Sequence, residues 1–161
     1  MKSHRVEASR LVDVDVDVAF DRLLATPLPT IFTKRYGAFP PVREVRDEPA
    51  DAWGVVGQSR TIVTGDGGTL RETLTSVERP TSFSYVIDAI TGPMRPFVRT
   101  IDGTWSVTPE GDAARIGWTW TLHPLAPPAR LTMNVMGKMW QGYADAGLQR
   151  LEQILTHRAL D

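Results

Sequence analysis

The sequence predicts an α+β fold in which a long C-terminal helix covers one antiparallel sheet. The stretch from Pro127 to Leu160 is predicted to form one helix of about 30 residues, because no proline interrupts it after Pro128. The region 42–123 alternates in hydropathy and is divided by short turn signals, which is typical of strands. Short connections favour antiparallel pairing, since parallel strands need long crossovers.

The N-terminal segment predicts a strand followed by a short helix. Residues 6–12 form the strand, which ends near Asp13. The spacing of apolar residues in "VAFDRLLA" predicts a helix beginning near Asp17, with Asp15 or Asp17 as its N-cap. The alternating aspartates do not form a calcium loop, because the glycine and glutamate that an EF-hand needs at its sixth and twelfth positions are missing.

A second short helix is predicted over "TPLPTIFTKRYG", residues 26–37, with Gly37 ending it. The i, i+4 spacing places Phe32 and Tyr36 on one face of this helix.

Six further strands are predicted, so the sheet has about seven. They are residues 42–47, 55–64, 69–78, 82–91, 97–108 and 113–123.

Period-2 alternation brings large apolar side chains to one face of the sheet, opposite an apolar stripe on the C-terminal helix. On the pattern alone, these side chains fit either a packed core or the wall of a ligand cavity. With the two aromatic residues of the second short helix, the candidate cavity residues are Phe32, Tyr36, Tyr85, Phe97, Trp105, Trp118, Trp120, Met133, Met136 and Trp140.

Two charged residues interrupt the inward pattern. Glu72 lies on the same face of its predicted strand as Leu70 and Leu74, and Arg99 lies on the same face of its strand as Phe97. A charge directed into an apolar interior is unfavourable unless it is paired or hydrated. Either these strand ends lie near solvent, or the two residues pair with each other, or they meet a polar group of a ligand.

Composition restricts the classes of function. The chain has 161 residues, a net charge of −1 and no cysteine. It is expected to form one domain, 1–161, with no thiolate chemistry and no basic surface for nucleic acid. No signal-peptide or membrane-spanning pattern is found, so a cytoplasmic location is expected. No cofactor or metal motif is present, and neither group is expected.

The order of elements, a strand, two small helices, a long sheet and a gripping helix, resembles the helix-grip fold of the START-like (SRPBCC) superfamily. The polyketide cyclase/dehydrase and lipid-transport family is the most similar branch. The resemblance rests on "VDVDVAFDRLL", "WGVVGQSRTIV", "GGTLRETLTSVERPTSFSYVI", "IDGTWSVTPEGDAARIGWTWTLHP" and "AGLQRLEQIL". It implies an internal cavity, between the sheet and the long helix, that holds hydrophobic molecules.

We therefore expect the protein to bind a small hydrophobic molecule, aromatic, polyketide-like or lipid-like, in that cavity. One alternative is a polyketide cyclase or dehydrase that uses Glu72 or Tyr85 as acid or base and Arg99 to stabilise an enolate. A second alternative is a protein-interaction module that receives a peptide on the concave sheet.

Overall fold

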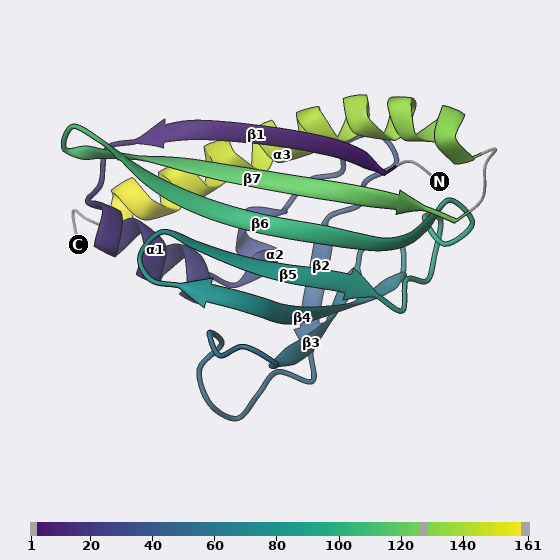
Figure 1. Ribbon diagram of the computed structural model, residues 1–161, viewed down its shortest axis with the longest axis horizontal. Coiled ribbons are helices and arrows are strands. Elements are labelled where there is room, and N and C mark those ends of the chain that lie inside the picture. Colours follow the sequence, from purple (N-terminus) through teal and green to yellow (C-terminus); the bar gives the residue numbers. More distant parts are fainter. Residues whose placement is uncertain (1–2, 126–128, 159–161) are drawn as a thin grey trace.

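The computed structural model describes residues 3–125 and 129–158, and its main feature is a seven-stranded antiparallel sheet (Figure 1). The strands are β1 (His4–Val12), β2 (Val42–Arg46), β3 (Ser59–Thr64), β4 (Thr69–Glu78), β5 (Ser82–Asp88), β6 (Val98–Glu110) and β7 (Ala113–Pro124). The helices are α1 (Val16–Ala25), α2 (Leu28–Ile31) and α3 (Ala129–Arg158). The sheet order is β1-β7-β6-β5-β4-β3-β2, which confirms the predicted α+β architecture. The prolines at the predicted start of the long helix, and its last predicted residues, lie outside the described ranges.

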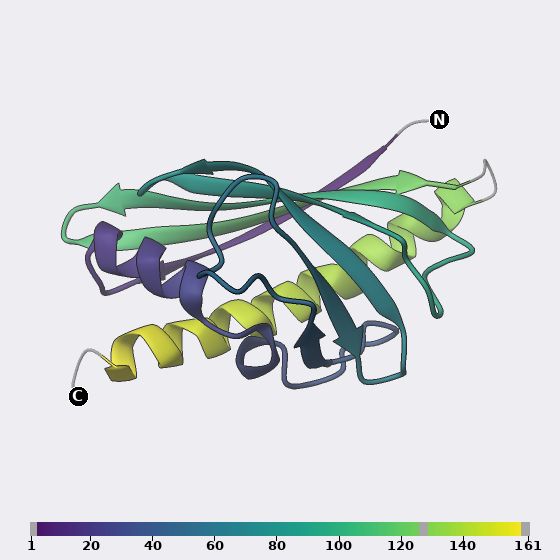
Figure 2. The same cartoon turned by 90° about the horizontal axis from the view of Figure 1, so that it is seen from below.

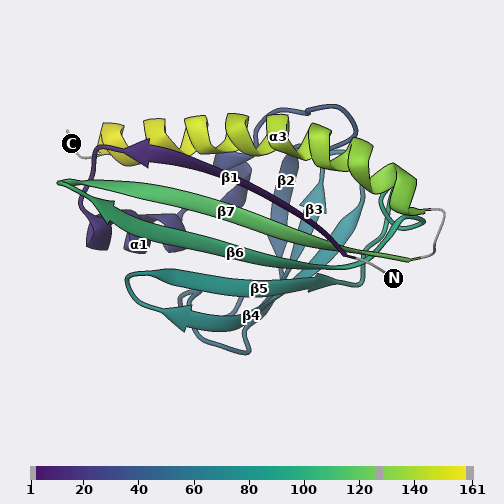
Figure 3. The ribbon, with the colours of Figure 1, turned by 45° about the horizontal axis from the view of Figure 1, so that its top comes forward.

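Helix α3 lies along the concave side of the sheet, and α1 and α2 lie beside the C-terminal half of α3 (Figures 2 and 3). Helix α3 packs mainly against β1 and β7. Its predicted apolar stripe is buried, as Met133, Trp140, Ala144, Leu151 and Leu155 show. A helix of this length gains most of its stability from covering such a stripe.

The first helix begins as predicted. The Asp15 side chain accepts hydrogen bonds from the backbone N–H groups of Asp17 (3.0 Å) and Val18 (3.4 Å). Asp15 is therefore the N-cap, and it satisfies N–H groups that have no partner within the helix.

The second helix is much shorter than predicted, because α2 ends at Ile31. Phe32 has φ −98° and ψ 73°, outside the helical region, and the chain then turns through Gly37 with φ +59°. Phe32 and Tyr36 therefore do not share a helix face. Phe32 is buried, whereas Tyr36 is 48% exposed and lies across Gly142 of α3.

The strand predicted from residue 55 begins only at Ser59. The Gln58 side chain accepts hydrogen bonds from the backbone N–H groups of Gly54 (2.8 Å) and Val55 (2.9 Å), which holds this segment in a loop. Val55 and Val56 are exposed as a result.

The prediction that Phe97 and Arg99 face inward is wrong. A register shift in the pairing of β6 with β7, between Val98 and Thr100, reverses the alternation at the start of β6. Val98 is buried there, Phe97 is 37% exposed and Arg99 is exposed. From Ile101 onward the predicted alternation holds.

Tryptophans dominate the core between α3 and the sheet. The rings of Trp105 and Trp118 stack with centroids 4.8 Å apart, and the Trp140 ring of α3 lies 4.9 Å from that of Trp118 and 5.9 Å from that of Trp120. These rings contact one another directly, so this part of the interface is packed core.

Candidate functional site

A cavity of about 70 Å³ lies beside the tryptophan cluster. Its wall comes from the concave face of β2–β7, from α2 and the segment that follows it, from the connection between β5 and β6, and from one residue of α3. The wall residues are Leu28, Phe32, Phe39, Pro40, Val42, Ile62, Thr64, Leu70, Glu72, Tyr85, Ile87, Met94, Trp105, Trp118, Trp120 and Tyr143. Cavities that bind drug-sized molecules usually have volumes of about 300–1,000 Å³. The cavity therefore fits only a compact molecule in this conformation.

The Tyr85 hydroxyl is a polar group in this mostly apolar wall. Its oxygen accepts hydrogen bonds from the indole N–H groups of Trp118 (2.8 Å) and Trp120 (2.9 Å). Since the phenol oxygen serves as acceptor in both bonds, its own proton remains for donation. Burial raises the pKa of the Tyr85 hydroxyl well above its ordinary value, and the nearby Glu72 carboxyl adds to this shift.

Gly103 allows Tyr85 to reach the two tryptophans. In the sheet, Gly103 of β6 is paired with Tyr85 on one side and with Trp120 on the other. A Cβ atom at this position would overlap the Tyr85 ring. The missing side chain thus lets the ring lie flat across β6.

Glu72 is the second polar group of the wall, and its partner is Arg60. The two residues are paired across β3 and β4, and the Arg60 Nε donates to Glu72 Oε1 at 2.7 Å. Both are buried, with 8% and 4% exposure. The guanidinium also stacks on Trp53, 4.0 Å from the ring centroid, and lies 3.9 Å from Glu48. Burial raises the pKa of the Glu72 carboxyl, and the charge of Arg60 opposes this shift.

Alkaline pH is expected to destabilise the fold through the buried tyrosines. Burial raises the pKa of Tyr85 and of Tyr143 in the folded state, whereas in the unfolded chain each ionises near pH 10. The folded state then binds more protons, so the free energy of unfolding falls above about pH 10, by up to about 1.4 kcal/mol per pH unit for each tyrosine. Urea unfolding between pH 9 and 11 measures this slope, and Y143F should make it shallower. An equal slope in Y143F would contradict burial as the cause.

Five of the ten predicted cavity residues line the cavity in the structure: Phe32, Tyr85, Trp105, Trp118 and Trp120. Met133, Met136 and Trp140 are buried in the core and do not belong to this wall. Tyr36 and Phe97 are on the surface. Of the three candidate catalytic residues, Glu72 and Tyr85 lie at the cavity, and Arg99 does not, because the irregular start of β6 turns it outward.

Ten of the sixteen wall residues were not among the predicted site residues, and neither was Arg60, which pairs with Glu72. Arg60 lies on a strand with mixed faces, so only the register with β4 reveals its partner. Tyr143 follows Trp140 by three residues and precedes Gly147 by four, so its spacing on the helix could have identified it. Phe39 lies in an irregular segment, where no periodicity signals burial.

Within residues 3–125 and 129–158, no cluster of three histidine, aspartate or glutamate side chains has a geometry suited to a metal ion. No helix in the described part of the chain combines the length and the hydropathy needed to cross a membrane.

A curved antiparallel sheet that grips one long helix, with a small cavity lined mainly by apolar residues, defines the helix-grip class of proteins. Residues 3–156 match the family described as "Polyketide cyclase / dehydrase and lipid transport", and the chain belongs to that family. No curated protein is similar enough in sequence to count as a match.

Solved structures support the fold assignment. The crystal structure of Ara h 8.0201 has a TM-score of 0.68 at 14% identity, with 97% of this chain and 99% of that one covered. A protein from Nitrosospira multiformis has a TM-score of 0.68 at 15% identity, with coverage of 98% and 100%. A protein from Thermus thermophilus has a TM-score of 0.69 at 18% identity, with coverage of 96% and 99%. At these identities the likeness shows the fold alone.

Proposed function

We propose that this protein binds a compact, mainly apolar molecule with one polar group in the cavity beside the tryptophan cluster. The observation that carries the proposal is the buried Tyr85 hydroxyl, which two indole N–H groups hold in place while its own proton is left to donate. The family description, which names polyketides and lipids, is in keeping with an apolar ligand.

The wall divides into an apolar part and a polar part, and each would select a different part of the ligand. Aromatic rings such as Phe32 and Trp105 would contact the hydrocarbon body, and burial of that body would supply most of the affinity. A carbonyl or hydroxyl oxygen of the ligand would accept a hydrogen bond from the Tyr85 hydroxyl, and Glu72 would accept one from any donor on the ligand. The small volume favours a molecule with a single ring.

Binding can be tested with cyclohexanone and methylenecyclohexane, which have similar shapes but differ in the oxygen that accepts a hydrogen bond. The indole ¹H–¹⁵N signals of Trp118 and Trp120 should shift on titration with cyclohexanone. In Y85F, cyclohexanone should bind about two- to tenfold more weakly, since one hydrogen bond contributes about 0.5–1.5 kcal/mol. The affinity for methylenecyclohexane should change little in this variant.

The matched control is Y36F, which removes the same atom from an exposed tyrosine outside the wall and should leave both affinities unchanged. The proposal fails if neither compound perturbs the indole signals, or if Y85F binds cyclohexanone as tightly as the wild type does.

A further inference from the structure

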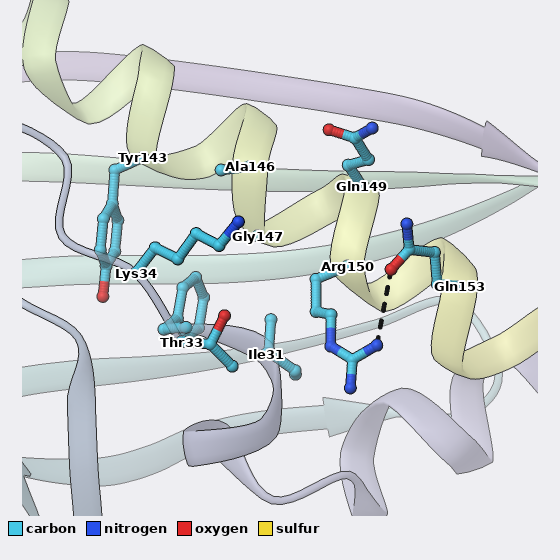
Figure 4. A pocket seen from close by; sticks show the side chains of 10 residues that line it. Ile31, Thr33, Lys34, Tyr143, Ala146, Gly147, Gln149, Arg150 and Gln153 are labelled. Atoms are coloured by element: carbon cyan, nitrogen blue, oxygen red, sulfur yellow. Dashed lines mark hydrogen bonds between the residues drawn. The ribbon is translucent and has the colours of Figure 1, made fainter.

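A second depression, of about 210 Å³, opens between the segment after α2 and the C-terminal half of α3, and we call it the outer groove (Figure 4). Residues 31–34 form one side of it, and residues of α3 from Tyr143 to Gln153 form the other. It shares Phe32 and Tyr143 with the cavity beside the tryptophan cluster, which we call the inner cavity. The rings of these two residues stand between the two spaces.

The floor of the outer groove is apolar and flat. The rings of Phe32 and Tyr143 stack with centroids 5.1 Å apart and an angle of 9° between their planes. Gly147 lets Phe32 lie close to the helix backbone, since a Cβ atom there would be 2.6 Å from the Phe32 Cε1. Ile31 extends this surface toward α2.

Two cations approach the outer groove from opposite sides. In Figure 4, Lys34 reaches from the segment after α2 toward α3, and Arg150 reaches from α3 back toward α2. The Arg150 Nε donates to the Thr30 carbonyl oxygen at 3.1 Å, and its Nη1 lies 3.5 Å from Gln153 Oε1.

These positive charges are not neutralised locally. No aspartate or glutamate among the described residues lines the outer groove. Among the ion pairs of the described residues, none includes Lys34 or Arg150. Because the whole chain has a net charge of −1, this excess of positive charge is a local property.

We propose that the outer groove binds an aromatic carboxylate, with its ring on the Phe32–Tyr143 floor and its carboxylate between Lys34 and Arg150. A guanidinium and an ammonium group that extend over one apolar floor from opposite sides suit a carboxylate, and charge-assisted hydrogen bonds are stronger than neutral ones. The site goes beyond the function proposed for the inner cavity and does not require that cavity to bind a ligand.

Calorimetric titration with naphthalene-2-carboxylate tests this site, with naphthalene-2-carboxamide as its neutral counterpart and acetate as an anion without the ring. The carboxylate should bind more tightly than either, and it should shift the backbone amide signals of Thr33 and Gly147. K34Q and R150Q should each raise its Kd about three- to tenfold. K34R should keep most of the affinity.

K138Q removes a lysine from an exposed position of the same helix, outside the outer groove, and should bind as the wild type does. Lys34 has no ion-pair partner among the described residues, so K34Q tests the site even if R150Q disturbs the contact between Arg150 and Thr30. Y85F should leave this affinity unchanged, which separates the outer groove from the inner cavity. Equal binding of the carboxamide, equal binding of acetate, or an unchanged Kd in K34Q would each overturn the proposal.

Discussion

The E72Q variant is expected to be less stable than the wild type by about 3–5 kcal/mol at pH 7, because it leaves the Arg60 guanidinium buried without its carboxylate. In the wild type, Arg60 Nε donates to Glu72 Oε1 at 2.7 Å, and both side chains are shielded from water. The remaining acidic neighbour, Glu48, is 3.9 Å away and about half-exposed, so it compensates poorly. Urea unfolding followed by tryptophan fluorescence measures the difference.

The double variant R60M/E72M is the informative control. Replacing both members of a buried ion pair with apolar residues often changes the free energy of unfolding little, so this variant should lie within about 1 kcal/mol of the wild type. D88N, which breaks the ion pair between Arg71 and Asp88 on an exposed part of the same sheet, should have a much smaller effect than E72Q. If E72Q is as stable as the wild type, the carboxyl is already neutral at pH 7 and the ion pair does not contribute.

The G103A variant is expected to be destabilised by about 3–5 kcal/mol, because overpacking adds to the loss of the Tyr85 hydrogen bonds. The new methyl group would overlap the Tyr85 ring. As the ring moves, the indole N–H groups of Trp118 and Trp120 lose their common acceptor inside the core. Their ¹H–¹⁵N signals should shift strongly, and the unfolding midpoint should fall.

G117A makes the same change in the neighbouring strand, where the added atom would meet only the Ser106 hydroxyl, which can rotate away. Its effect should therefore be much smaller. In a Y85L background, where no ring lies over position 103, G103A should lose most of its effect, and a double-mutant cycle measures this coupling. Equal costs of G103A in both backgrounds would refute the role assigned to Gly103.

The fold could be predicted from the sequence because its main signals are local. The alternation from Ile116 to Leu122 and the stripe from Met133 to Leu155 specify which faces are buried, and the structure buries them. Prediction failed where the backbone departs from regular geometry. The register shift at the start of β6 exposes Arg99, and the early end of α2 exposes Tyr36.

The candidate site could be predicted only in part, because it depends on register and on contacts between distant residues. Periodicity indicates that Glu72 and Tyr85 face inward. It does not show that Arg60 is paired with Glu72 across β3 and β4, or that Gly103 separates Tyr85 from Trp120 across β6.

The element order, the antiparallel sheet, the covering helix and an aromatic-rich interior all follow from the spacing of residues along the chain. How that interior is divided depends on the packing of the folded molecule. Packing places Trp105, Trp118 and Trp140 together as core and leaves about 70 Å³ beside them. The volume of a cavity is the small difference between the space that the backbone encloses and the volume of the side chains from every element. It therefore cannot be read from any one segment of the sequence.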